Sequence, residues 1–127
     1  MRARVLPLFL AAAALLVSPA GEGIATASPS PWQVSGATYY GPGLYGNRTA
    51  CGQTLTPDLV GVAHRSLPCG TNVEFEWHGR TVVAPVVDRG PFGSTSIEWD
   101  LTEAACRRLS APGDNRCITH EIAWRTL

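Results

Sequence analysis

The chain has 127 residues, and its 10 basic side chains balance 10 acidic ones, so the formal net charge is zero. All the basic side chains are arginines, and they form no cluster, which argues against a nucleic-acid-binding surface. This length is enough for one domain and too short for two.

The N-terminus has the pattern of a signal peptide. Two arginines near the start precede an apolar run over residues 5–17, which is shorter than the about 20 residues that cross a bilayer and so disfavours an uncleaved anchor. Cleavage after Ala20 or after Ala27 fits the small-residue rule, and we favour Ala27 because Ala-x-Ala precedes the cut. The expected division is residues 1–27 as signal peptide, 28–33 as linker and 34–127 as one exported, secreted domain.

Four cysteines lie in the expected exported domain. An even number in a small exported domain predicts two disulfides, and four cysteines allow three pairings. The simplest pairing joins neighbours along the chain, Cys51 with Cys69 and Cys106 with Cys117. The chain lacks the close Cys-x-x-Cys and His-x-x-x-His spacings of a zinc site. We therefore expect neither a metal nor another cofactor.

The first predicted elements alternate with Gly and Pro. Residues 34–40 predict a strand, and the glycine-rich stretch 41–51 predicts a loop. A short apolar strand is expected over residues 59–63, ending at His64. Such brief strands between turn residues are typical of small β-proteins.

The clearest pattern is a hairpin over residues 71–87, where apolar and polar residues alternate and His78-Gly79 forms the turn. Pro85 within its second strand indicates an edge or a bulge. Residues 102–109 predict a helix capped by Thr102, and residues 118–125 predict a last strand. About six short strands and one helix in this length predict a small closed β-barrel.

Several motifs occur in a specific order. They are A-T-Y-Y-G-P-G at 37–43, A-H-R-S-L-P-C-G-T at 63–71, D-R-G-P-F at 88–92 and W-D-L-T at 99–102. In order and separation they closely resemble the RlpA-like (rare lipoprotein A) double-psi β-barrel, over about residues 36–109 and again in the last strand. The first two cysteines resemble those of the secreted, disulfide-bearing branch of that family.

This resemblance implies a six-stranded double-psi barrel whose groove binds a polysaccharide. Members of the family are lytic transglycosylases that cleave peptidoglycan glycan strands, preferably strands that lack stem peptides. Two residues needed for activity in that family correspond to His64 and Asp88. In the related expansins and in one endoglucanase family, an aspartate before the helix matters, and it corresponds to Asp100.

The two aspartates suit this chemistry. Cleaving a glycosidic bond requires a proton on the leaving oxygen, and a carboxyl group keeps a proton near neutral pH only when burial or a nearby carboxylate raises its pKa. We predict Asp88 as the acid and base, His64 as the residue that orients it or binds substrate, and Asp100 as shaping the electrostatic field. In the simpler interpretation Asp88 is a turn residue, Asp100 caps the helix and His64 is a hydrogen-bonded strand end.

Further substrate contacts are expected from aromatic and charged side chains near the motifs. The predicted substrate-binding residues are Asp100, Tyr39, Tyr40, Arg89 and Trp99. One of the two tyrosines must face away from the core, because strand neighbours point to opposite sides. We expect a monomer that is secreted or located in the cell wall, and the resemblance implies peptidoglycan as its partner, with neither nucleic acid nor stable membrane insertion. The alternative is an expansin-like barrel that binds glycan, or inhibits another protein, without cutting.

Overall fold

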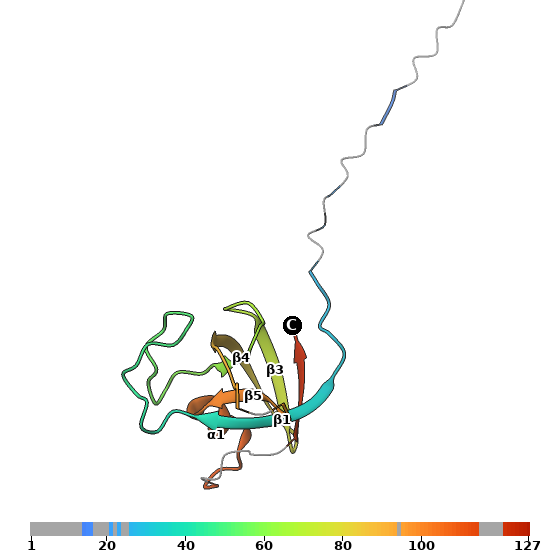
Figure 1. Ribbon diagram of the computed structural model, residues 1–127. Helices are drawn as coiled ribbons and strands as arrows, with labels where there is room; N and C mark the ends of the chain where they lie inside the picture. The colour runs from blue at the N-terminus through green and yellow to red at the C-terminus, as the bar shows by residue number, and fades with distance from the viewer. Residues whose placement is uncertain (1–13, 17–20, 22, 24–25, 94, 115–120) are drawn as a thin grey trace, which may run out of the picture.

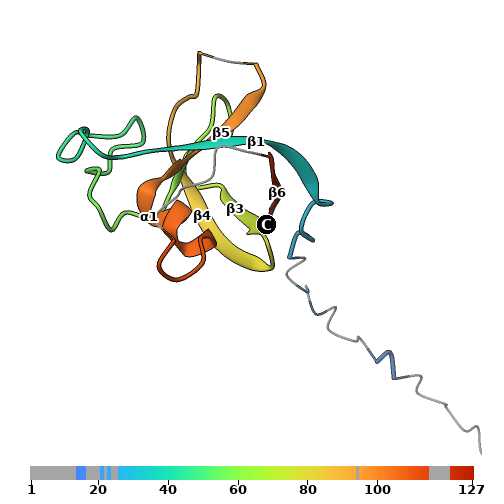
Figure 2. The ribbon, with the colours of Figure 1, turned by 90° about the horizontal axis from the view of Figure 1, so that it is seen from below.

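Six strands form a closed barrel in the order β1-β5-β2-β4-β3-β6, with one helix beside it, in the part of the chain that the structure describes (Figures 1 and 2). The structure is a computed structural model and describes all residues except 1–13, 17–20, 22, 24–25, 94 and 115–120. The elements are β1 (Gln33–Tyr40), β2 (Val62–Ala63), β3 (Asn72–Trp77), β4 (Arg80–Asp88), β5 (Ile97–Thr102), α1 (Glu103–Leu109) and β6 (Glu121–Thr126). The predicted mainly-β barrel with six strands and one short helix is confirmed.

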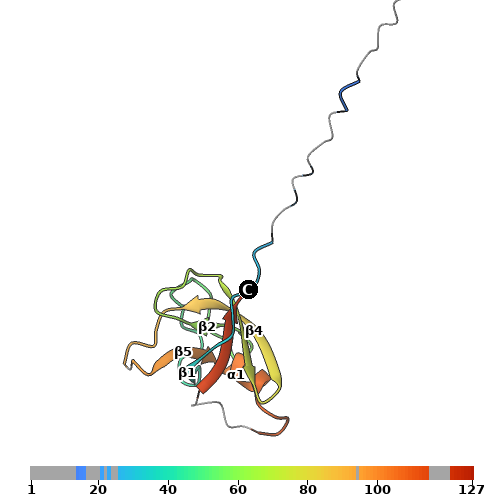
Figure 3. The same cartoon turned by 90° about the vertical axis from the view of Figure 1, so that its right-hand side faces the viewer.

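Two parallel ladders are built into the barrel. β1 pairs in parallel with β5, and β2 pairs in parallel with β4, while the other ladders are antiparallel. Strand β2 is only two residues long, yet it pairs with both β4 and β5 (Figure 3). The loop of residues 41–55 leaves β1 and projects from the side of the barrel away from β6 (Figures 1 and 2).

The core fills the barrel with inward-facing side chains of alternating strand positions. Its centre is Trp99, which is fully buried, with ring centroids 5.1 Å from Phe75 and 4.8 Å from Trp124. The prediction that Trp99 binds substrate is therefore wrong. A side chain with no exposed surface cannot offer a face to a glycan, and burying an indole of this size stabilises the barrel instead.

The β3–β4 hairpin turns at His78 and Gly79, as predicted, and both residues have positive φ angles, 48° and 77°. Two such residues in a two-residue turn match the right-handed twist of the flanking strands. Pro85 lies opposite Asn72 inside a closed barrel and so is not at an edge. It precedes a register irregularity between β2 and β4, where a missing amide donor is tolerated.

Helix α1 begins as the sequence predicts. The Thr102 hydroxyl accepts a hydrogen bond from the Ala105 amide at 3.3 Å, and also one from the Gly61 amide at 3.1 Å. The cap is therefore Thr102, and the interpretation of Asp100 as the helix cap is wrong. Ala105, Cys106 and Leu109 bury the inner face of the helix.

Three predictions fall wholly or partly outside the described residues. Cys117 is outside them, so the predicted bond to the buried Cys106 is not described. The last strand is seen from Glu121, and its predicted start at residue 118 is outside. Most of the predicted signal peptide is outside as well. Within the described part of the chain, no helix is both long enough and apolar enough to cross a membrane.

Candidate active site

Asp88 and Asp100 lie on either side of Ala63. In the β2 ladders, Ala63 is the register partner of Asp88 in β4 and of Asp100 in β5. Register partners on neighbouring strands point to the same face of a sheet. Val62, which precedes Ala63 in β2, and its partners Val86 and Leu101 are buried in the core. The two aspartates therefore share the opposite face. The structure thus brings the two predicted carboxylates together, although Asp100 sits within a strand and not at its end.

A cavity of about 260 Å³ opens over this face. It is lined by the two aspartates, by Ala63 between them in the register, by Tyr40 of β1 and by Arg89. The other lining residues belong to the loop segment 44–55, which we call the cavity wall.

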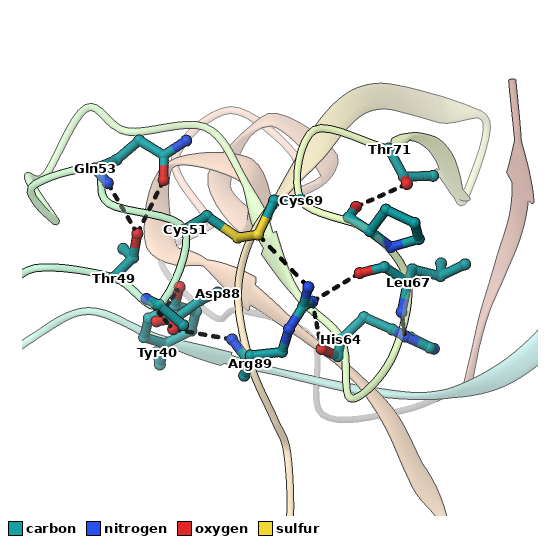
Figure 4. The surroundings of a disulfide bond; sticks show 12 residues. Tyr40, Thr49, Cys51, Gln53, His64, Leu67, Cys69, Thr71, Asp88 and Arg89 are labelled. Carbon is teal, nitrogen blue, oxygen red and sulfur yellow. Dashed lines mark hydrogen bonds between the residues drawn. A yellow bond between two sulfur atoms is a disulfide. The ribbon is translucent and has the colours of Figure 1, made fainter.

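Asp88 is surrounded by hydrogen-bond donors. Its Oδ1 accepts from the backbone amides of Ala50 and Arg89, each at 2.9 Å, and its Oδ2 accepts from the Tyr40 hydroxyl at 3.2 Å (Figure 4). Burial and the charge of Asp88 raise the pKa of Tyr40, so that hydroxyl remains a donor. Three donors are what an ionised carboxylate accepts.

Asp100 has the opposite environment. Its Oδ1 is buried and has no hydrogen-bond partner among the described residues. Burial first, and then the negative charge of Asp88, raise the pKa of Asp100 to about 6. Asp100 is thus the carboxyl group that keeps a proton in mildly acidic solution, whereas the expectation placed the acid at Asp88. Two neighbouring carboxyl groups held in different states are a recurring pattern in enzymes that transfer protons.

His64 does not line the cavity. Its ring packs against Trp99, with 4.5 Å between the ring centroids, and its Nε2 lies 3.6 Å from a Glu98 carboxylate oxygen. Burial lowers the pKa of His64. Its link to Asp88 is through the backbone, where the His64 amide donates to the Asp88 carbonyl at 3.2 Å. The side chain therefore does not orient the Asp88 carboxylate directly, contrary to the expectation.

Arg89 lines the cavity, and its contact with substrate stays a prediction. Its guanidinium donates to the carbonyls of Leu67 and His64, at 2.7 and 3.2 Å, so it also holds a loop next to the cavity (Figure 4). Tyr39 is partly exposed but does not line the cavity, whereas Tyr40 does. Strand alternation predicts that only one of the two tyrosines faces the site.

Sequence reasoning expected the glycine-rich loop to border the groove through Cys51, but it named none of the loop residues that line the cavity. The Cys51–Cys69 disulfide, with a Cα–Cα distance of 5.8 Å, confirms the local pairing and joins the wall to the strand end after His64 (Figure 4). The Cys51 amide also donates to the Val87 carbonyl at 3.1 Å, and the Tyr45 hydroxyl donates to the Glu103 carboxylate. The wall is thereby fixed to the barrel at several points.

Within the described residues, no three His, Cys, Asp or Glu side chains gather as metal ligands. The cavity presents a carboxyl group whose pKa is raised to about 6, a second carboxyl group that accepts three hydrogen bonds, and the phenol that donates one of them.

Comparisons with known proteins place these features in context. A sequence profile of the family described as "Lytic transglycolase" matches residues 32–119. A protein of Synechocystis named probable endolytic peptidoglycan transglycosylase RlpA is 40% identical over 75 residues, which are 58% of this chain and 23% of that protein. The chain thus spans about a quarter of the length of this curated relative.

Two solved structures have the same architecture. The expansin of Clavibacter michiganensis superposes with a TM-score of 0.58 and 27% identity, covering 76% of this chain and 50% of the expansin. A Streptomyces papain inhibitor superposes with a TM-score of 0.57 and 28% identity, covering 76% of this chain and 94% of the inhibitor.

Proposed function

Since this chain belongs to the lytic transglycolase family of RlpA-like double-psi β-barrels, we propose that it is a secreted peptidoglycan lytic transglycosylase. It cleaves glycan strands, preferably those without stem peptides, and leaves 1,6-anhydro-muramoyl ends. The observation that carries the proposal is the proton-holding Asp100 beside the hydrogen-bonded Asp88 on one cavity face. A signal peptide over residues 1–27 and action of the monomeric domain in the cell wall belong to the same proposal.

The proposed reaction needs a single acid and base. Asp100 donates its proton to the glycosidic oxygen as the bond from that oxygen to the muramoyl C1 breaks. The negative charge of Asp88 stabilises the oxocarbenium-like centre that forms at C1. The ionised Asp100 then takes the proton of the muramoyl 6-hydroxyl, whose oxygen bonds to C1 and closes the anhydro ring. Asp100 ends as it began, with its proton, and no water is consumed.

The direct test is product analysis. Purified protein is incubated with peptide-stripped glycan strands, and the products are identified by mass spectrometry. We expect anhydro-muramoyl ends, their absence with Asp88→Asn, and unchanged products with Asp58→Asn, an exposed aspartate outside the cavity. Reducing ends would instead mean hydrolysis by water. Intact strands, with the protein retained on insoluble glycan, would contradict catalysis and favour glycan binding alone.

The pH dependence of cleavage follows from Asp100. Its protonated form is the proton donor, so kcat/KM is expected to fall as the pH rises through about 6. The measurement is initial cleavage rates at low substrate concentration from about pH 4 to about pH 8, where the slope reports groups of the free enzyme. A rate that is flat or rising across about pH 6 would contradict the assignment of Asp100 as the acid.

A second candidate function is inhibition of a protease. It is favoured by one observation, that the matching region accounts for almost the whole of the Streptomyces papain inhibitor but a minority of the transglycosylase. Phe92, which is 75% exposed on the loop after β4, suits contact with a protein partner. In a titration of papain, stoichiometric inhibition that weakens in Phe92→Ser, together with intact glycan strands, would favour this function over cleavage.

A further inference from the structure

The loop of residues 65–69 connects His64 to the disulfide at Cys69, and it is held from two sides. On one side, the Nδ1 atom of His64 accepts hydrogen bonds from the backbone amides of Ser66 and Leu67, at 3.1 and 3.0 Å. On the other side, the guanidinium of Arg89 donates to the Leu67 carbonyl at 2.7 Å (Figure 4). The imidazole thus holds the amide of Leu67, and the guanidinium holds the carbonyl of the same residue.

The two amide hydrogen bonds determine the form of the imidazole. An Nδ1 atom that accepts from amides cannot carry a proton, so the proton of the neutral ring is on Nε2. Nε2 faces Glu98, and the ring is packed on Trp99. Glu98 favours a charged ring, whereas burial and the charges of Arg65 and Arg89 oppose it, and the net effect lowers the pKa. The imidazole is accordingly neutral and engaged on its Nδ1 edge, its Nε2 edge and its face.

The loop is connected to both backbone donors of Asp88. One donor is the Arg89 amide, and the Arg89 guanidinium donates to the Leu67 carbonyl in the loop. Ala50 carries the other, and the neighbouring Cys51 is bonded to Cys69 at the end of the loop. Displacing the loop would therefore move both amides that hold the Oδ1 atom of Asp88.

We propose that His64 is a positioning residue, which acts as a neutral acceptor at Nδ1 to hold the 65–69 loop and, through it, the two amide donors of Asp88. It neither touches substrate nor transfers a proton. This role rests on the proposed function only where activity is the readout, because the tautomer and the loop contacts exist without substrate.

Two substitutions distinguish the role of Nδ1 from that of Nε2. In His64→Asn, the amide oxygen lies near the former Nδ1 and can accept the same two hydrogen bonds, as asparagine does in turns. In His64→Gln, the amide nitrogen lies near the former Nε2 and no acceptor remains for Ser66 and Leu67. We expect His64→Asn to keep kcat/KM within about threefold and His64→Gln to lose about tenfold or more, because two amides lose their acceptor. The loss is expected in kcat more than in KM, and thermal unfolding of both variants checks that they fold.

Nuclear magnetic resonance supplies the readout that is independent of activity. In the wild-type protein, the ¹⁵N signal of Nδ1 is expected at the position of an unprotonated ring nitrogen and that of Nε2 at a protonated one. The amide signals of Ala50 and Arg89 are expected to shift in His64→Gln and to stay near their wild-type positions in His64→Asn. The Ala50 amide is the discriminating one, because Arg89 contacts the His64 backbone directly, whereas Ala50 is linked to the loop through the disulfide. A merely local structural role would leave the Ala50 amide unchanged.

The outcomes distinguish this proposal from the proposed function. If no glycan is cleaved but the tautomer and amide shifts are as expected, the positioning role stands and the transglycosylase assignment fails. If cleavage is observed but Nδ1 is protonated, or His64→Gln keeps activity that His64→Asn loses, the positioning role is overturned. Unchanged Ala50 and Arg89 signals in His64→Gln would overturn it as well.

Discussion

Replacing Asp100 with asparagine is expected to lower kcat/KM for glycan cleavage by about 10²- to 10⁴-fold, the usual contribution of a general acid and base. The substitution removes the group that gives and then takes back a proton in the proposed reaction, yet it preserves the shape of the side chain. It is the sharpest test of the exchanged roles, because the motif resemblance alone placed the acid at Asp88.

The same substitution is expected to stabilise the fold in alkaline solution. The pKa of Asp100 is raised to about 6 in the folded protein from an ordinary value of 3.8. Stability from the protonated form is therefore present below about pH 4 and is lost as the pH rises through about 6, above which a buried negative charge must be accommodated. Asparagine carries no such charge. The melting temperature of Asp100→Asn should exceed that of the wild-type protein at about pH 8 by more than it does at about pH 4.

The decisive comparison measures both properties in one set of variants. Asp58→Asn, on the exposed surface, should match the wild-type protein in cleavage and in melting temperature at both pH values. If Asp100→Asn cleaves at the wild-type rate, Asp100 is not the acid. If its melting temperature relative to the wild-type protein is the same at both pH values, the carboxyl group is not destabilised by burial.

Removing the disulfide should have the largest effect on stability. Cys51 and Cys69 are separated by 18 positions, and a cross-link over such a loop contributes about 2–4 kcal/mol to the free energy of unfolding. The double variant Cys51→Ala, Cys69→Ala should show this loss in chemical unfolding under oxidising conditions. It should also lose cleavage activity while still folded, since the cavity wall carries the Ala50 amide that binds Asp88.

The matched control is the wild-type protein with its disulfide reduced, which should unfold at nearly the same denaturant concentration as the double variant. Equal stability of the oxidised wild-type protein and the double variant would show that the hydrogen bonds of the wall suffice without the covalent link. Full activity of the folded double variant would show that the wall does not need the disulfide to hold Asp88.

The alternation of strand residues made most of the fold predictable. The β3–β4 hairpin and its turn at His78 follow from a period of two, and the helix start follows from the capping chemistry of Thr102. The local pairing at Cys51 was the simplest of three and is the one observed. The same alternation also implies that Trp99 is buried, because a residue next to a cavity-facing Asp100 must face the core.

The roles of the site residues were less predictable, because they depend on pairings between distant segments. Asp88 and Asp100 are neighbours only through Ala63, and the pKa of Asp100 is raised by burial and by that neighbour. No local pattern encodes such an environment. His64 likewise was identified by its motif, but which of its ring nitrogens is engaged depends on the path of the loop that follows it.

The two-residue strand β2 also has a consequence for how the protein acquires its site. The partners of its Ala63 that line the cavity, Asp88 and Asp100, lie about 25 to 37 positions away in the sequence, so no short segment of the chain contains a partial site. Contacts between residues so far apart in the sequence form late and slowly, because closing a long loop costs entropy before the contact can stabilise the fold. We expect glycan cleavage to recover during refolding only together with the change in tryptophan fluorescence that accompanies burial of Trp99 and Trp124, as one cooperative event and not in stages.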